Sequence, residues 1–237
     1  MQAPPATDYL PHLAYDSVIF GFTGTALKIL ILEYHHTNWF ALPGGFVRRG
    51  EALNDAVRRG LRERTALDDI YLEQFYTFGA ADRHRPAVMR TIMEANGYTV
   101  PEDYWMLDRF VSVAYYALID YHTVEPRPDV LSDSIAWYGV DELPPLLFDH
   151  AEIVERALQT LRQNLGQRIT GANLLPPLFT MKQLQGVYEA ILGEQLHRSS
   201  FQRKMLASGL LERREKQRTG GAHKAPYLYR FTTTTND

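Results

Sequence analysis

The first part of the chain consists of short runs of β-branched and aromatic residues, broken by glycine and polar residues. Asp16–Phe22 and Ala26–Tyr34 are two such runs separated by Thr23-Gly24-Thr25, and together they predict a β-hairpin. The same pattern predicts further strands over Ile70–Phe78, Phe110–Ile119 and Ser134–Val140. Strands interspersed with helical segments indicate a layered α/β domain.

Helical periodicity marks two segments of this part. Leu53–Thr65 has Ala56, Val57, Gly60 and Leu61 at helical spacing, and a second helix is expected from about Ala151 to Leu165. Between the predicted strands, Ala81 to Asp108 is a polar insertion that we expect to be a long loop. Such a loop either contacts a ligand or is a plain surface excursion. Its aromatic residues, Tyr98, Tyr104 and Trp105, indicate that it packs against something.

The C-terminal part has a different order of elements. After a predicted linker from Arg168 to Pro177, Thr180 is a plausible N-cap for a helix with Leu184, Val187, Tyr188 and Ile191 on one face, ended by Gly193. A second helix, capped by Ser199 or Ser200, turns Phe201 and Met205 inward and ends at Gly209. Leu210–Arg214 and Tyr227–Phe231 predict a hairpin whose tip, from Glu215 to Ala225, is basic.

This order is typical of a winged helix-turn-helix. Only two clear helices precede the hairpin, so a third is either short or recruited from Ala151–Leu165. We therefore expect an N-terminal domain over residues 1–166 and a winged-helix domain over residues 167–237.

Charge separates the same two parts. The whole chain has a net charge of -3, but residues 170–237 contain ten Lys and Arg against five Asp and Glu. A basic C-terminal module on an acidic protein suits a polyanionic partner, although solvated surface charge alone would give a similar count.

Composition otherwise describes an ordinary folded protein. Apolar residues make up 45% and charged residues 22% of the 237 positions, which is enough to bury a sizeable core. The absence of cysteine excludes disulfides and thiolate chemistry. With no pattern of a signal peptide at the start and no apolar run near 20 residues, we expect a cytoplasmic protein.

One motif is much more specific than these patterns. Gly44-Gly45-Phe46-Val47-Arg48-Arg49-Gly50-Glu51 is followed after seven residues by Arg59-Gly60-Leu61-Arg62-Glu63-Arg64. The stretch resembles a Nudix box, in which Gly45, Glu51, Arg59 and Glu63 occupy the expected positions. In Nudix hydrolases three late glutamates of one helix hold Mg²⁺ or Mn²⁺, and here their positions are Gly60, Glu63 and Arg64. The resemblance therefore implies a vestigial box that holds no metal.

Together, the degenerate box and the basic winged helix resemble the Nudix-related transcriptional regulators, which include the NrtR repressors of NAD metabolism and the AraR regulators. The resemblance covers nearly the whole chain. It implies a Nudix-type α/β/α sandwich that senses an effector, followed by a winged helix that binds operator DNA as a homodimer, with no cofactor. The motifs that carry it are Trp39–Val47, Tyr71–Gln74, Phe78-Gly79, Val111–Leu118, Phe148–His150, Leu174–Pro176, Phe179-Thr180, Phe201–Lys204 and Tyr227–Phe231.

The resemblance also implies where an effector binds. An Arg-Asp-Pro-Arg type of segment in NAD-linked members survives here only as Asp82-Arg83-His84-Arg85, with Arg109 beyond the insertion. We predict that Arg64, Asp82, Arg83, Arg85 and Arg109 border the effector site. ADP-ribose, another nucleotide diphosphate compound and a sugar all remain open. Arg64 either contacts an effector phosphate or pairs with Glu63 or Glu51, and His150 caps or braces the helix that follows it.

Residues for DNA are expected on the second C-terminal helix and on the wing. Arg203 is the best candidate for reading a guanine edge, because its forked guanidinium fits O6 and N7. Phosphate contact alone is the alternative for any one of these residues. The predicted set is Arg198, Ser199, Gln202, Arg203, Lys204, Lys216, Arg218 and Lys224.

Three classes of function are compatible with these patterns. A ligand-responsive transcriptional regulator accounts for both parts of the chain, because a basic winged helix has no obvious use in a hydrolase. The alternative is a Nudix hydrolase of a nucleoside diphosphate derivative such as ADP-ribose, which Mg²⁺-dependent release of nucleotide would identify. The third is a protein-binding module, which a salt-insensitive, DNA-free pull-down would favour.

Overall fold

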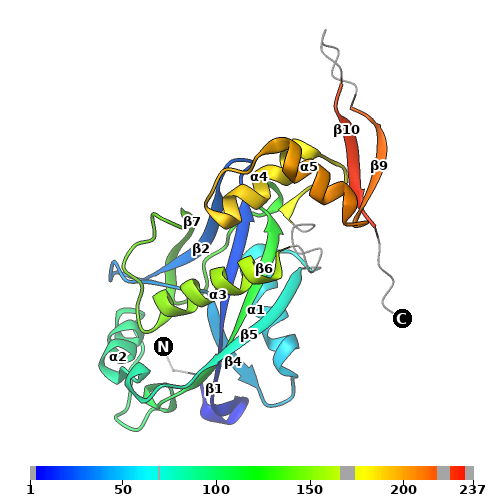
Figure 1. The fold of residues 1–237 in the computed structure, drawn as a ribbon. Helices are drawn as coiled ribbons and strands as arrows, with labels where there is room; N and C mark the ends of the chain where they lie inside the picture. Colours follow the sequence, from blue (N-terminus) through cyan, green and yellow to red (C-terminus); the bar gives the residue numbers. More distant parts are fainter. Residues whose placement is uncertain (1–3, 69, 166–173, 218–224, 233–237) are drawn as a thin grey trace.

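The computed structural model describes residues 4–68, 70–165, 174–217 and 225–232 (Figure 1). Its helices are α1 (Leu53–Thr65), α2 (Pro86–Ala95), α3 (His150–Asn164), α4 (Met181–Leu192) and α5 (Arg198–Ala207). Its strands are β1 (Tyr9–Phe22), β2 (Leu27–Tyr34), β3 (Phe40–Ala41), β4 (Gly44–Arg48), β5 (Tyr71–Phe78), β6 (Val111–Asp120), β7 (Ser132–Gly139), β8 (Phe179–Thr180), β9 (Leu211–Lys216) and β10 (Tyr227–Phe231). No helix among these residues is both long enough and apolar enough to cross a bilayer.

A mixed sheet forms the centre of the N-terminal domain. Its strands follow the order β3-β2-β1-β6-β5, with β4 paired to β1 and β7 paired to β2. β1 runs parallel to β6 over a long register, from Leu13 opposite Val111 to Phe22 opposite Asp120. β1 and β2 form the predicted hairpin, in which Phe20 lies opposite Ile29.

Alternation along the strands divides the core into two layers. Val18, Phe20 and Tyr116 point to one face, which α3 covers with Ile153 and Ala157. Their neighbours along the strands point to the other face, which α1 covers with Val57 and Leu61. Figure 1 shows α3 crossing the sheet with α1 on the opposite side. The predicted α/β/α sandwich is confirmed.

The polar insertion is not the long loop expected from its composition. Pro86 begins α2, where its missing N–H costs nothing, and two 3-10 turns, η2 (Ala81–Arg83) and η3 (Trp105–Leu107), flank that helix. Met93, Val100, Met106 and Leu107 form a small apolar cluster of their own. This buried cluster makes the insertion a packed subdomain, as its aromatic residues indicated.

The C-terminal elements form the expected winged helix. β8 precedes α4 and α5, the strands β9 and β10 follow, and the sheet order is β8-β10-β9. Thr180 caps α4 in a reciprocal capping box with Gln183, and Gly193 ends it in a left-handed conformation. The N-cap of α5 is His197, so the predicted caps Ser199 and Ser200 instead lie in its first turn.

The two domains share one continuous apolar core. Leu184, Val187 and Ile191 of α4 belong to the same buried cluster as Phe22 and Leu27 of the β1–β2 hairpin. Arg162 of α3 donates from Nε to the carbonyl of Ile191 at 2.8 Å.

The predicted linker is only partly described. Residues 168–173 lie outside the described residues, whereas Leu174 and Leu175 are buried in the shared core, so the end of that segment is not a free tether.

Candidate functional site

A cavity of about 320 Å³ opens beside α1, between the Nudix-box strand β4 and the insertion. The box, the insertion and the segment before β7 all contribute to its wall. The lining includes Tyr9, Tyr15, Asp16, Gly44, Phe46, Arg59, Glu63, Arg64, Arg83, Arg85, Asp129, Leu131, Phe148 and His150. A concave site with apolar walls and a few convergent polar groups is the usual form of a small-molecule pocket.

The structural half of the box is intact. Arg59 binds Glu51 with two hydrogen bonds, from Nη2 at 2.8 Å and from Nε at 3.1 Å, and its Nη2 also reaches the Phe46 carbonyl. The Arg59 hydrogen bond holds the pKa of Glu51 below its usual value. Glu51 and Arg59 therefore fasten the loop before α1 to the helix itself.

The position of the first missing carboxylate is filled by another side chain. A Cβ on Gly60 would lie 2.2 Å from the Tyr15 hydroxyl oxygen, and a Cβ on Gly45 would lie 2.6 Å from the same atom. Tyr15 is buried, and that burial raises the pKa of its phenol, so the hydroxyl remains protonated. A glutamate side chain at position 60 has no room unless Tyr15 moves.

Arg64 occupies the third carboxylate position and is held firmly. Its guanidinium donates to Asp129 at 2.6 Å, to the Gly44 carbonyl at 3.0 Å and to the Gly60 carbonyl at 3.1 Å. The ion-pair partner is thus Asp129, and the pairing predicted with Glu63 or Glu51 is wrong. Glu63 instead lies half-exposed, 3.5 Å from Arg59. The two carboxylate positions on either side of Glu63 are thus occupied by a phenol and a guanidinium.

A second charged network lies under the cavity. Arg83 binds Asp149 with two hydrogen bonds of 2.8 and 3.0 Å and lies 3.5 Å from Asp16. Ser112 donates to Oδ2 of Asp16 at 2.5 Å, the same oxygen that lies closest to Arg83. All four side chains are largely buried, so the two carboxylates are held by one shared guanidinium inside the protein rather than by solvent.

His150 joins this network to the first turn of α3. The backbone N–H of Leu42 donates to its Nδ1 at 2.9 Å, so Nδ1 is unprotonated and Nε2 carries the proton 3.5 Å from Asp16. Burial lowers the pKa of His150, which favours this neutral imidazole. Asp149, not His150, is the N-cap residue, and the bracing role predicted for His150 fits its contact with Leu42.

The predicted effector residues separate into three groups. Arg64, Arg83 and Arg85 line the cavity, and of these the side chain of Arg85 is exposed. Asp82 lines an adjoining depression of about 250 Å³ beside Tyr76 and Asp149. Arg109 lines neither of these two cavities and donates to the Gly79 carbonyl.

The aromatic side chains of Tyr9 and Phe46 also line the cavity. The ring of Tyr9 stacks on Trp105, with centroids 5.2 Å apart and planes 21° apart. Phe46 meets the same indole edge-on at 4.9 Å. Trp105 of the insertion therefore supports the rings of Tyr9 and Phe46, which line the cavity, without lining it itself.

The predicted DNA-binding residues share one helix face only in part. Helical spacing places Ser199 and Arg203 on the outer side of α5, away from the buried Phe201 and Met205, with the half-buried Gln202 at the flank. Arg198 lies seven residues before Met205, so it is on the inner side, but it is exposed because it begins the helix. Lys204 points to a different side of the helix. Among the described residues, no carboxylate forms an ion pair with Arg198, Arg203 or Lys204, so their charge is directed to solvent. Leu206, 47% exposed, lies on the same outer face and was missed from the sequence.

The wing is described only at its base. The ammonium of Lys216 lies 5.2 Å from the centre of the Tyr227 ring, and Arg213 lies over the same ring at 4.6 Å. Arg218 and Lys224, also predicted to bind DNA, lie outside the described residues.

Several residues of the cavity could not be found by their position in the sequence. Asp129 lies 65 residues from Arg64, and Asp149 lies 66 residues from Arg83. A motif that covers only a few neighbouring residues cannot identify pairs this far apart in the sequence. For Tyr15 the sequence holds only an indirect signal. Glycine at two positions of the box indicates that another group packs closely against the backbone there, but it does not identify that group as Tyr15.

Comparison with known proteins matches both parts of the chain. The NrtR DNA-binding winged helix domain matches residues 171–231, and the NUDIX domain matches residues 10–158. The ADPR responsive transcriptional repressor NtrR of Acinetobacter baylyi is 30% identical over 228 residues, which span 93% of this chain and 82% of that protein.

Solved structures agree with these matches. Shewanella oneidensis NrtR is 28% identical, with a TM-score of 0.70 and coverage of 93% of this chain and 94% of that one. The same protein complexed with a 27mer DNA is 27% identical, with a TM-score of 0.68 and coverage of 93% of each chain. A MutT/nudix family protein from Enterococcus faecalis shares the fold at 22% identity, with a TM-score of 0.69 and coverage of 94% and 89%.

Proposed function

The chain belongs to the NrtR family of Nudix-related transcriptional regulators, and we propose that its Nudix domain senses ADP-ribose without hydrolysing it while its winged helix binds operator DNA. The observation that carries this proposal is the filled metal position: Tyr15 takes the space beside Gly60, and Arg64 is paired with Asp129. Hard divalent cations need several oxygen ligands, and one glutamate cannot supply them. The cavity itself remains open, which suits binding without turnover.

The chemistry of the cavity supports a nucleoside diphosphate as its ligand. Tyr9 and Phe46 offer flat aromatic surface to a base, and Arg85 offers an exposed guanidinium to a phosphate. The Acinetobacter baylyi relative is described as ADPR responsive. Among the ligands that the sequence left open, ADP-ribose combines the base, the diphosphate and the polyol that these walls suit.

The DNA-binding face in this proposal is the outer side of α5. Arg198 and Arg203 are exposed, and Gln202 is half-buried, on the second helix of the winged helix, which is the helix that enters the major groove in proteins of this type. Leu206 on the same face adds an apolar group suited to a thymine methyl. Lys216 at the base of the wing contacts the phosphate backbone, and a homodimer would present two such faces to a palindromic operator.

Communication between the two sites has a physical route through α3. The first turn of this helix holds Asp149 and His150, which contact Arg83 and Asp16 beneath the cavity. Its last turn holds Arg162, which binds the Ile191 carbonyl at the end of α4. A ligand that shifts Arg83 therefore moves a helix that packs against the DNA-binding domain, and this coupling is part of the proposal.

The catalytic part of the proposal is tested by incubating the protein with ADP-ribose and either Mg²⁺ or Mn²⁺ and measuring release of AMP. We expect none, together with calorimetric binding of intact ADP-ribose. Metal-dependent turnover that Glu63→Gln abolishes would instead establish the hydrolase alternative.

The location of the ligand is tested by two arginine variants with opposite expectations. Arg85→Ala removes an exposed guanidinium from the cavity wall and should weaken ADP-ribose binding. Arg109→Ala is the matched control, because Arg109 lies outside the two cavities described above. Equal loss in both variants, or loss in the control alone, would place the ligand elsewhere.

A further inference from the structure

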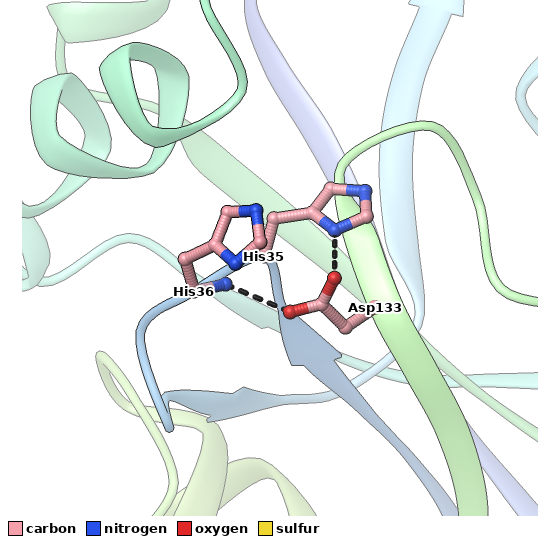
Figure 2. Close-up of side chains that lie close together, drawn as sticks. All are labelled: His35, His36 and Asp133. Carbon is pink, nitrogen blue, oxygen red and sulfur yellow. Dashed lines mark hydrogen bonds and ion pairs between the residues drawn. The ribbon is translucent and has the colours of Figure 1, made fainter.

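A cluster of two histidines and one aspartate lies outside both cavities, at one end of the β2–β7 pair. His35 and His36 follow β2 directly, and Asp133 is the second residue of β7 (Figure 2). One ligand atom from each of the three side chains lies within 4.8 Å of the other two. We propose that these residues form a binding site for a transition-metal dication of the Zn²⁺ class.

The side chains already converge without a metal. Figure 2 shows the Asp133 carboxylate reaching from β7 to the turn, with one oxygen against Nδ1 of His35. Its other oxygen accepts the backbone N–H of His36 at 2.8 Å. The imidazole of His36 lies beside that of His35, with ring centroids 5.8 Å apart. These contacts fix the turn, so a metal would find its donors largely in place.

Small side-chain rotations would complete the geometry. A tetrahedral Zn²⁺ with bonds of about 2.1 Å holds its ligand atoms roughly 3.4 Å apart. The ligand atoms of the cluster all lie within 4.8 Å of one another, and the exposed side chain of His36 can turn about its own bonds. Three protein ligands would leave a fourth position for water.

The types of donor select the class of metal. Imidazole nitrogen suits Zn²⁺, Ni²⁺ and Cu²⁺, whereas Mg²⁺ and Ca²⁺ prefer a full set of oxygens. The site is thus different in kind from the vestigial box, whose ligands would have been carboxylates for Mg²⁺. Its existence does not depend on the function proposed for the cavity or for α5.

A metal here would brace a segment that reaches the cavity. The backbone N–H of His35 donates to the Leu131 carbonyl at 3.2 Å, and Asp129, two residues earlier, holds Arg64. Joining both histidines to Asp133 would fasten the turn after β2 to this segment. Bound Zn²⁺ should therefore raise the thermal unfolding temperature, since a ligand of the folded state stabilises it by mass action.

The test is Zn²⁺ titration of the untagged full chain against a chromophoric chelator, with no DNA or nucleotide present. His36→Asn removes the imidazole but suits the left-handed backbone of this residue, whose φ is 57°. Asp133→Asn keeps the side-chain oxygen that accepts the His36 N–H. We expect one Zn²⁺ per wild-type chain, binding weaker by about tenfold or more in each variant, and no saturable binding of Mg²⁺.

The matched control is His12→Asn. His12 is also exposed, has a left-handed φ of 60° and lies 4.0 Å from an aspartate, Asp108, but the sequence places no second histidine beside it. This control should bind Zn²⁺ as the wild type does and show the same thermal shift. Absence of saturable Zn²⁺ binding to the wild type, or equal weakening in His12→Asn, would overturn the proposal and leave the cluster as a hydrogen-bonded turn.

Discussion

Arginines in the two domains have opposite surroundings. In the Nudix domain Arg59, Arg64 and Arg83 are each mostly buried and each bound by a carboxylate. The partner of Arg59 lies in the same box, and those of Arg64 and Arg83 come from a distant part of the chain. On α5 Arg198 and Arg203 are exposed, and within the described part of the chain neither pairs with a carboxylate. The buried arginines hold the cavity together, whereas the exposed ones leave their charge available to a polyanion.

This difference shows why a net charge alone is a poor guide to binding. A buried ion pair is expensive to break, because the remaining charge stays in a medium of low polarity. An exposed arginine costs little to replace but carries electrostatic attraction to phosphates. Replacing one residue of each kind should therefore separate stability from DNA binding.

The largest effect is expected for Arg83→Ala. It leaves Asp16 and Asp149 without their shared partner in a buried site, so the free energy of unfolding should fall by about 3 to 5 kcal/mol. Urea unfolding of this variant beside Arg203→Ala, which should change by less than about 0.5 kcal/mol, gives the comparison. Similar losses in the two variants would remove the distinction drawn between the two regions.

Arg203→Ala, which should hardly change stability, should weaken DNA binding. Arg203→Ala should cost about 1 to 3 kcal/mol of binding free energy at a single base position and relax specificity there. Lys216→Ala should instead weaken binding to every sequence alike and reduce the log–log salt slope by about one. Gel-shift titrations against a selected duplex and its scrambled version measure both quantities, and identical profiles for the two variants would contradict the assignment of base and phosphate contacts.

Gly60→Ala tests the filled metal position. The added methyl group meets the Tyr15 hydroxyl at 2.2 Å, so overpacking should cost about 1 to 3 kcal/mol although alanine favours helix. Adding Tyr15→Phe, which removes that oxygen, should restore much of the loss. Gly50→Ala is the control, because a Cβ there meets nothing within 4 Å, and a loss in the control as large as in Gly60→Ala would show that the space is not limited by Tyr15.

The smallest effect concerns pH. The pKa of His150 is lowered in the folded chain, so below about pH 6.5 the unfolded chain takes up a proton that the folded chain resists. The free energy of unfolding should therefore decline as the pH falls below that value. His150 contributes at most about 1.4 kcal/mol per pH unit to this slope. His150→Gln should flatten the decline between pH 7.5 and 5, while the exposed His122→Gln should not; parallel curves for all three proteins would exclude His150 as the cause.

Periodicity and turn residues were enough to predict most of the fold. Box helix α1 begins and ends where the apolar spacing placed it, and Thr180 caps α4 as its position before an apolar run indicated. Helix α2 was missed because the polar composition of the insertion outweighed the spacing of Val88, Met89, Ile92 and Met93. The boundary between the domains at residues 166 and 167 stays a prediction.

The site was less accessible from sequence, for a physical reason. The sequence showed that carboxylates are missing at positions 60 and 64, because the residues of the box are separated by short, fixed spacings. It could not show what replaced them, since Tyr15 and Asp129 approach through the folded sheet from far along the chain. The roles predicted for Arg64, Asp82, Arg83 and Arg85 with the effector remain predictions, and the one predicted for Arg109, which lines neither cavity, is what the Arg109→Ala variant tests. The DNA contacts of Arg198, Ser199, Gln202, Arg203, Lys204, Lys216, Arg218 and Lys224 also remain predictions.

The central claim is that one chain binds DNA through α5 and answers to a ligand that it does not destroy. The most direct test is the affinity for a duplex selected from a random library, measured with and without ADP-ribose in the presence of Mg²⁺, followed by recovery of the nucleotide. We predict sequence-specific binding whose affinity shifts by about fivefold or more with ADP-ribose, and recovery of intact ADP-ribose. An unchanged affinity while ADP-ribose is bound, or its conversion to AMP, would contradict the account.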